Sequence, residues 1–246
     1  MALLEQESVG DVLVVRMNRP PANAMAPELL EAGVVLCAEL AADPPPAIVL
    51  TGSGSFFSGG VDLKLAPTLT EAEQIGSVQS INELFLGWYG FPGPVVAAVN
   101  GHAVAGGLIL ALCADFRVAA VGARVGLTEA RVGIPYPVAA MTGVKAELDP
   151  RAARRLVLQA ELIEIEQAHE LGVVDEVVEP AVVVDRAIQV AEGLAALPTR
   201  AYREVKQQLR GETVAAMRAA IPSDPMLEGW LSDETEGAAR AVLEGD

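Results

Sequence analysis

The sequence has few of the residues that build disulfides and metal sites: its 246 residues include two cysteines and two histidines. Cys37 and Cys113 lie in apolar stretches of helical spacing without a basic neighbour in the sequence. We therefore expect buried, unreactive thiols rather than a disulfide or a nucleophile. His102 and His169 belong to no H-E-x-x-H motif or cysteine cluster, so no metal site is expected. Packing or a turn hydrogen bond explains His102 better than a role as a base.

Positive charge is also scarce, with 17 Lys and Arg residues against 33 Asp and Glu residues and a net charge of -16. Because no basic stripe is present, no nucleic-acid partner is expected. A polyanionic ligand would have to be held by backbone groups and a few local cations. No apolar run approaches the roughly 18 to 20 residues of a membrane span, and the first residues lack the basic and apolar regions of a signal peptide. We expect a cytoplasmic protein without a membrane partner.

Apolar side chains are abundant: they make up 52% of the residues and give a mean hydropathy of +0.37. A chain of this length and composition can bury a sizeable core. Up to about residue 150, short β-branched stretches alternate with stretches of helical apolar spacing. The expected strands are residues 11–18, 47–52, 94–101 and 115–120, and the expected helices are residues 26–43, 70–90, 106–114 and 137–148. This alternation predicts an α/β fold.

Beyond residue 148 the pattern becomes nearly continuous helix. Helices are expected over residues 149–159, 165–172, 181–197 and 199–210, and over a final stretch to about residue 243. Residues 173–179 are the one strand expected to interrupt them. Prolines punctuate these helices, and no sequence repeat or low-complexity linker is visible. The pattern predicts a helical region that serves in assembly or as a lid.

Two glycine-rich turns and one carboxylate carry the candidate chemistry. The turns are FFSGGVDLK, residues 56–64, and NGHAVAGGLILALCADFR, residues 100–117, where Gly106 and Gly107 open a helix. Free N–H groups at such a helix start attract negative charge, and glycine lets a ligand approach the backbone closely. Strand-to-helix punctuation explains either turn alone. Together with Glu129, an acid among apolar residues, the two turns indicate a binding or catalytic site.

Five stretches resemble the crotonase (enoyl-coenzyme A hydratase/isomerase) superfamily. In order, they are NRPPANAM, AIVLTGSGSFFSGGVDLK, AAVNGHAVAGGLILALCADFRVA, GLTEARVGI and AHELGVVDEVV. The resemblance spans residues 9 to about 180 and, more weakly, the helical tail. It implies repeated ββα units over residues 1–180 and a C-terminal helical trimerisation region over residues 181–246. It also implies a homotrimer or hexamer that binds acyl-coenzyme A thioesters without a separate cofactor.

The resemblance assigns roles to residues of both turns. The backbone N–H groups of Val61 and Gly106 would hold the thioester oxygen, where charge develops when an enolate forms. Further substrate contacts are expected from Ala22, Asp62, Leu63, Lys64, Gly107, Ile109 and Ile134. Of these, Lys64 either meets a phosphate of coenzyme A or is simply exposed. Asp115 and Arg117 are expected to be structural.

The carboxylates separate the activities of the superfamily. Hydratases carry two glutamates, whereas this chain has Ile109 at the first of those positions and Glu129 at the second. Water addition relies on both acids, but one carboxylate suffices to move a proton from the α-carbon to the γ-carbon of a β,γ-unsaturated thioester. Apolar neighbours such as Leu108, Ile109 and Ile134 would raise the pKa of Glu129 toward neutrality.

The chain therefore most resembles the monofunctional enoyl-CoA isomerases of fatty acid metabolism. The resemblance predicts conversion of 3-enoyl-CoA to 2-trans-enoyl-CoA, with Glu129 as the single proton shuttle. Three alternatives stay open: a hydratase, a lyase or synthase acting through the same enolate, and a non-catalytic acyl-CoA-binding protein.

Overall fold

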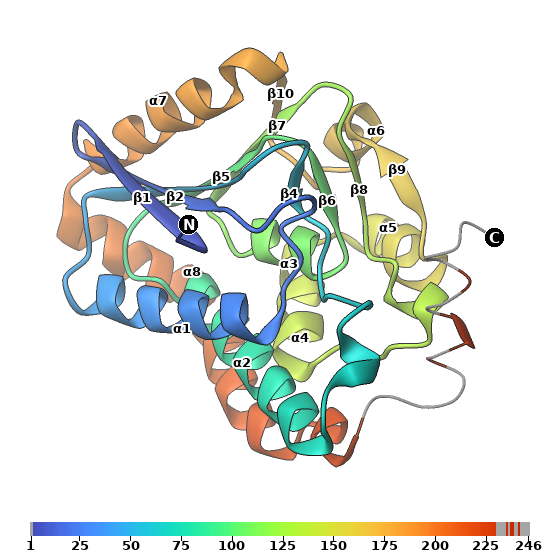
Figure 1. Ribbon diagram of the computed structural model, residues 1–246. Coiled ribbons are helices and arrows are strands. Elements are labelled where there is room, and N and C mark those ends of the chain that lie inside the picture. The colour runs from blue at the N-terminus through green and yellow to red at the C-terminus, as the bar shows by residue number, and fades with distance from the viewer. Residues whose placement is uncertain (1, 230–234, 236, 239–240, 242–246) are drawn as a thin grey trace.

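The computed structural model describes residues 2–229, 235, 237–238 and 241 (Figure 1). Its strands are β1 (Leu4–Val9), β2 (Val12–Met17), β3 (Ala47–Gly52), β4 (Phe56–Ser58), β5 (Val95–Val99), β6 (His102–Val104), β7 (Phe116–Ala120), β8 (Arg124–Gly126), β9 (Leu162–Glu164) and β10 (Glu176–Val178). Its helices are α1 (Pro27–Ala42), α2 (Glu71–Tyr89), α3 (Gly106–Leu112), α4 (Val138–Glu147), α5 (Pro150–Ala153), α6 (Ile165–Glu170), α7 (Val183–Ala195) and α8 (Thr199–Ala220). The predicted α/β class is confirmed.

The chain repeats the order strand, strand, helix as β1-β2-α1, β3-β4-α2, β5-β6-α3 and β7-β8-α4. From the second unit on, the first strand of each unit joins the larger sheet and the second strand joins the smaller one. The larger sheet has the order β1-β2-β3-β5-β7-β10, and the smaller has the order β4-β6-β8-β9. In these three units the chain passes from the larger sheet into the smaller one. The segments that follow β4, β6 and β8 hold Val61, Gly106 and Glu129, the candidate site residues.

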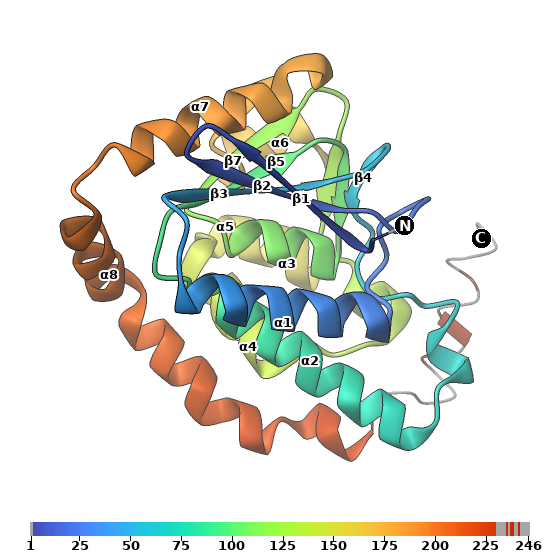
Figure 2. The same ribbon diagram turned by 60° about the vertical axis from the view of Figure 1, so that its left-hand side comes forward.

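The central strands of the larger sheet are buried on both faces. Strands β2, β3, β5, β7 and β10 run parallel, and β1 is antiparallel to β2. Every residue of β3 and β5 is buried, which explains why both strands are continuous apolar runs. Figure 2 shows α7 over one face and α1 and α3 over the other. Since side chains alternate along a strand, Val14 packs toward α7 whereas Val15 packs toward the helices on the opposite side.

Charged side chains of α8 fasten this helix to the core. The Lys206 ammonium donates to Asp115 Oδ2 at 2.7 Å and to the Gly93 carbonyl at 2.8 Å. The Arg210 guanidinium donates to the carbonyls of Cys113 at 2.8 Å and Ala114 at 2.9 Å. These bonds satisfy the carbonyls at the end of α3, so they set the distance between α8 and the helix that begins at Gly106. The structural role expected for Asp115 is confirmed.

Most expected elements are confirmed. Strand β1, whose six residues are mostly exposed, was not expected, and the other unexpected strands share a cause. Residues 47–52 and 27–42 form the predicted strand and helix, with Pro27 in the first turn. The strands β4, β6, β8 and β9 were not expected, and each has only three residues. The expectation of a single strand after residue 148 was wrong, because β9 precedes β10. Three residues are too few for an alternating pattern to be recognised. Of the final helix expected to about residue 243, residues 211–220 belong to α8, but residues 221–223 and 225–228 form short 3-10 turns instead. Most of the remainder lies outside the described residues.

In the described residues, no helix combines the length and hydropathy that a membrane crossing requires. The C-terminal helices α7 and α8 pack on elements of residues 1–180. The boundary at residue 180 stays a prediction.

Candidate active site

A cavity of about 490 Å³ opens where the two glycine turns meet. Its walls also include the segment before α1, one face of α2, and the turns η2 (Glu129–Val132) and η6 (Pro225–Glu228). Most of the predicted site residues line this cavity: Ala22, Val61, Asp62, Leu63, Lys64, Gly106, Ile109, Glu129 and Ile134. The fold thus brings together residues that are more than a hundred positions apart in the sequence.

Val61 presents its backbone N–H to the cavity because of how its neighbours pair. Met25 and Val61 form an isolated parallel bridge, in which Met25 N–H donates to the Gly60 carbonyl at 2.7 Å and Asp62 N–H donates to the Met25 carbonyl at 3.4 Å. In parallel pairing, the bridged residue's own N–H points away from the partner strand. Within the described chain, no acceptor is found for the Val61 N–H.

Gly106 supplies a second free N–H at the start of α3. The preceding Ala105 adopts a φ of 53°, a conformation that costs a residue with a Cβ about 1 to 3 kcal/mol. The Ala105 N–H donates to the Gly126 carbonyl at 2.8 Å, and this hydrogen bond holds the turn in place. As the first residue of α3, Gly106 has no intrahelical acceptor for its N–H.

Gly60 lets the two turns approach each other. Its φ is +78°, and a Cβ built on it would lie 2.9 Å from both the Ala105 Cβ and the Val104 carbonyl oxygen. The same Cβ would lie 3.0 Å from the Gly106 nitrogen. A side chain at position 60 would therefore separate the turns, so glycine is required for the N–H groups of Val61 and Gly106 to serve one ligand atom.

Glu129 is a buried acid without a full set of partners. It lies in the short turn η2 and is 8% exposed. In the described part of the chain, its Oε2 has no hydrogen-bond partner. Burial raises the pKa of Glu129 to about 7, although a hydrogen bond from its own backbone and one from Tyr136 lower it somewhat. A carboxylate in this state can accept or release a proton near neutral pH.

Tyr136 packs beside Glu129 and was not identified from the sequence. Its hydroxyl donates to the Leu127 carbonyl at 3.2 Å. Burial and then the neighbouring Glu129 carboxylate raise the pKa of Tyr136. The hydroxyl therefore stays protonated, and its single hydrogen serves either the Leu127 carbonyl or the Glu129 carboxylate. In the sequence, Tyr136 stands between two prolines seven positions after the acid, and nothing in that spacing indicates the contact.

The wall facing Glu129 is apolar. Ile109, 3% exposed, lines the cavity from α3 at the position where hydratases carry an acid. Val78, Ile81 and Phe85 line it from α2. Their spacing of three and four residues indicates a buried helix face but does not distinguish a cavity wall from an ordinary core. Met226 of η6 completes the wall, and sequence analysis placed no site residue in that region.

Asp224 fixes η6 against the rest of the site. This carboxylate is 2% exposed. Its Oδ2 accepts hydrogen bonds from Asn82 at 2.7 Å and from the Val138 N–H at 2.9 Å, and its Oδ1 accepts from the Met226 N–H at 2.9 Å. One side chain therefore joins the C-terminal segment to α2 and to the start of α4, and holds Met226 in the cavity wall.

Charged residues surround the mouth of the cavity. The Arg19 guanidinium pairs with Asp62 at 2.8 Å and with Glu28 at 3.2 Å. Asp62 also accepts from the Lys64 N–H at 3.2 Å, so it shapes the turn as well as lining the cavity. The Lys64 side chain is exposed and makes no ion pair within the described residues. Arg19 was not singled out by sequence analysis.

Gly107 does not line the cavity, contrary to the prediction of a substrate contact. A Cβ built on Gly107 would lie 2.1 Å from the Ser58 carbonyl oxygen. The glycine therefore permits close packing of α3 on β4. The reason is geometric: successive residues of a helix point in different directions, so Gly106 faces the cavity while Gly107 faces Ser58.

The cysteines, His102 and Arg117 are buried or bonded to neighbouring residues of the fold. Cys37 and Cys113 are both free and buried, and burial raises the pKa of each thiol to about 12. His102 accepts a hydrogen bond from the Arg124 N–H at 3.0 Å, which confirms the expected turn contact. The Arg117 guanidinium pairs with Glu147 and Asp175. The described residues contain no group of three or more His, Cys, Asp and Glu that could hold a metal ion.

Comparisons with known proteins identify the family and the fold. A family model described as enoyl-CoA hydratase/isomerase matches residues 7–237. A putative enoyl-CoA hydratase of Thermus thermophilus is 36% identical over 209 residues, which are 83% of this chain and 82% of that protein. The structure of a probable enoyl-CoA hydratase from Mycobacterium tuberculosis is 31% identical, with a TM-score of 0.84 over 90% of this chain and 94% of that one. The human mitochondrial delta3-delta2-enoyl-CoA isomerase is 25% identical, with a TM-score of 0.92 over 99% of this chain and 98% of that one. The chain therefore belongs to the enoyl-CoA hydratase/isomerase family, the crotonase superfamily, and has its fold.

Proposed function

We propose that this protein is an enoyl-CoA isomerase that converts 3-enoyl-CoA to 2-trans-enoyl-CoA. The observation that carries the proposal is Glu129, the one buried carboxylate among the described residues that line the cavity. Its Oε2 is unbonded, burial raises its pKa to about 7, and Ile109 lines the same cavity. An acid poised near neutral pH accepts a proton and returns it with little driving force in either direction. Such reversibility suits an isomerisation, in which the same proton leaves and rejoins the substrate.

The N–H groups of Val61 and Gly106 would hold the thioester oxygen. Gly60 lets the two turns approach each other. In the described structure neither of these N–H groups donates a hydrogen bond to another acceptor. When the α-proton leaves, negative charge moves onto this oxygen, so fixed donors stabilise the enolate more than the ground state. Loss of one such donor typically lowers the rate about a hundredfold or more.

The proton then moves within one substrate molecule. Glu129 takes a proton from the α-carbon, and the electron pair of that C–H bond forms the enolate. The enolate returns its electrons toward the γ-carbon, which recovers the proton from the neutral Glu129 while the double bond moves into conjugation. No water is consumed, and neither a redox partner nor a separate cofactor is needed.

The coenzyme A portion would lie at the mouth of the cavity. Ala22 and Leu63 line the cavity and would contact the coenzyme A portion mainly through backbone. The exposed Lys64 would face a phosphate. Arg19 is held by Asp62 and Glu28, so its charge is already partly balanced.

Hydration of 2-enoyl-CoA is the second candidate, because the relatives include proteins named as hydratases. A hydratase would need a second group to orient water. The counterpart position here is Ile109, a side chain that cannot accept or donate a hydrogen bond.

Substrate comparison tests the proposal. The protein is incubated separately with a 3-enoyl-CoA and a 2-trans-enoyl-CoA, and conjugation and hydration are followed by absorbance and mass. We expect isomerisation at least about a hundredfold faster than hydration, the range that one general acid-base group typically supplies. Comparable rates for both reactions would refute the isomerase assignment. A matched variant, Ile109→Glu, should raise hydration relative to isomerisation if its carboxylate reaches water.

A further inference from the structure

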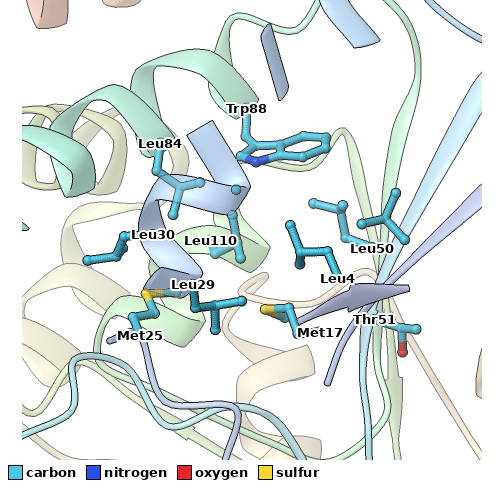
Figure 3. A pocket seen from close by; sticks show the side chains of 12 residues that line it. Leu4, Met17, Met25, Leu29, Leu30, Leu50, Thr51, Leu84, Trp88 and Leu110 are labelled. Carbon is cyan, nitrogen blue, oxygen red and sulfur yellow. The ribbon is translucent and has the colours of Figure 1, made fainter. Parts of the chain in front are cut away.

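A second, smaller cavity of about 30 Å³ lies between the larger sheet and helices α1, α2 and α3 (Figure 3). We call it the rear cavity. Its lining consists mostly of aliphatic side chains and includes Val15, Met25, Leu29, Leu30 and Thr51. The Thr51 hydroxyl donates to the Ala98 carbonyl at 2.9 Å, so its hydrogen-bonding need is met. The rear cavity therefore has an apolar lining suited to aliphatic groups rather than water.

Met25 lines both the rear cavity and the active-site cavity. In the described chain, the two cavities have no other lining residue in common. Figure 3 places Met25 at one edge of the group of side chains around the rear cavity, near Leu29 and Leu30. Its sulfur lies 3.2 Å from the position that a Cβ on Gly106 would occupy. The thioether thus lies against the proposed oxygen-binding turn, where it separates the substrate from the space behind.

The backbone of Met25 is fixed, whereas its side chain has room to move. The backbone forms the bridge to Val61 through both its N–H and its carbonyl. Methionine is unbranched and has three rotatable side-chain bonds, so it adapts to irregular spaces at low cost. The rear cavity, at about 30 Å³, exceeds the roughly 10 to 15 Å³ that one water-sized group requires, and a methyl group is of about that size. The rear cavity is too small for an acyl tail but large enough for the terminal methyl of Met25.

We propose that Met25 is a movable wall that determines which acyl groups the site accepts. Its terminal methyl moves into the rear cavity when a long acyl chain binds, which enlarges the active-site cavity. With a short acyl chain, Met25 keeps its position against Gly106. This inference rests on the acyl-thioester function proposed above and adds a specificity-determining residue to it.

Binding of saturated acyl-CoA esters tests the inference without requiring turnover. The dissociation constants of butanoyl-CoA and dodecanoyl-CoA are measured by calorimetry, and the ratio of the two is compared among variants. Met25→Ala removes the wall, so dodecanoyl-CoA should gain about fourfold in affinity for each methylene newly buried, with butanoyl-CoA little changed. Val15→Ile adds a methyl group to the rear cavity, so it should weaken dodecanoyl-CoA selectively.

Val14→Ile is the matched control. Val14 adjoins Val15 on β2 but packs on the opposite face of the sheet, so the same added methyl should leave the ratio unchanged. Met25→Leu keeps most of the side-chain volume, but its side chain is shorter and extends less far into the rear cavity. This variant replaces Met25→Ala if Met25→Ala is unfolded at the assay temperature. It should weaken dodecanoyl-CoA and spare butanoyl-CoA.

The outcomes separate the two proposals. If the wild type binds both esters and their affinity ratio is the same in the Met25 and Val15 variants, the movable wall is wrong and the proposed function stands. If the wild type binds neither ester, the proposed function fails, and the inference fails with it.

Discussion

Glu129 shows how one residue acquires reactivity from its surroundings. In water its carboxylate would be ionised and well solvated at neutral pH. Here burial raises its pKa to about 7, and the unbonded Oε2 leaves an oxygen free for a substrate proton. The neighbouring Tyr136 hydroxyl moderates the shift, because a hydrogen bond to the charged form favours ionisation.

Glu129→Gln separates a base from a structural residue. The amide keeps the shape of the side chain but cannot accept a proton, so we expect turnover to fall by about a hundred- to ten-thousandfold. Acyl-CoA affinity should change little. Steady-state rates and calorimetric affinities are measured side by side. Near-native turnover would exclude Glu129 as the base, and parallel loss of rate and affinity would indicate structural damage instead.

The pKa of Glu129 also predicts a pH dependence of the rate. The carboxylate must be ionised to accept the α-proton, so kcat/KM should rise with pH and level off above about 7. A pH-rate profile on a 3-enoyl-CoA measures this directly. A flat profile between about pH 5 and pH 8 would contradict a base with this pKa.

The same shift makes the stability of the protein depend on pH. Folding raises the pKa of Glu129 from its ordinary 4.5 to about 7, so its contribution to stability is present below about pH 4.5 and is lost as pH rises to about 7. At about pH 8, Glu129→Gln should therefore be more stable than the wild type by about 3 kcal/mol. Below about pH 4.5 the difference should vanish. Urea unfolding at both pH values checks the sign, and a more stable wild type at about pH 8 would contradict it.

At the scale of elements, the site depends on short turns held by remote contacts. The turn η6 has no neighbour in sequence within the site, and Asp224 connects it to Asn82 of α2 and to the N–H of Val138. Because Met226 lines the cavity, the position of this turn is part of the substrate-binding surface.

Asp224→Ala should release η6 and weaken substrate binding. We expect KM to rise about tenfold with kcat within about twofold, because Met226 leaves the wall while Glu129 stays in place; the three lost hydrogen bonds to a charged group correspond to about 1.5 to 3 kcal/mol each in stability. Steady-state kinetics and thermal unfolding measure both effects. Asp149→Ala is the control, since Asp149 similarly accepts two backbone N–H bonds at the start of α5 but lies outside the cavity lining. An equal KM change in both variants would refute the specific role of Asp224.

At the scale of the whole molecule, α8 has a buried face and, on its exposed side, a pair of apolar residues. Lys206, Arg210 and Met217 face the core, whereas Val205 and Leu209 are 60% and 79% exposed. These two residues are four positions apart and therefore lie on the same face of the helix. We expect this exposed aliphatic pair to contact a second copy of the chain in the predicted trimer.

Light scattering at micromolar concentration tests this assembly. We expect a particle of about three or six times the 25.6 kDa chain mass. Leu209→Glu should shift it toward the single chain if α8 lies in the interface, because it places a charge on the apolar face. Gln208→Glu adds the same charge at an adjacent exposed position and should leave the particle mass unchanged. A wild-type mass near 25.6 kDa would rule out the predicted trimer.

The sequence by itself determined the α/β class, the longer elements and the two glycine turns. Those features depend on local causes: the β-branched run of β3, the apolar spacing and Pro27 of α1, and the inability of residues other than glycine to fill the turn at Gly60. Glu129 was also identified from its own segment. Each of these signals lies within a few neighbouring residues, which is the range over which backbone preferences and periodicity act.

Only the tertiary structure decided which residues meet. The apolar wall from α2, the Asp224 contact of η6, Tyr136 beside Glu129 and the Met25 partition between two cavities all join positions that no local pattern relates. It also showed that Gly106 faces the cavity while Gly107 packs on Ser58. The physical reason is that the burial of Glu129, and with it the pKa, is a sum over side chains brought from distant segments, and this sum exists only after the chain has folded.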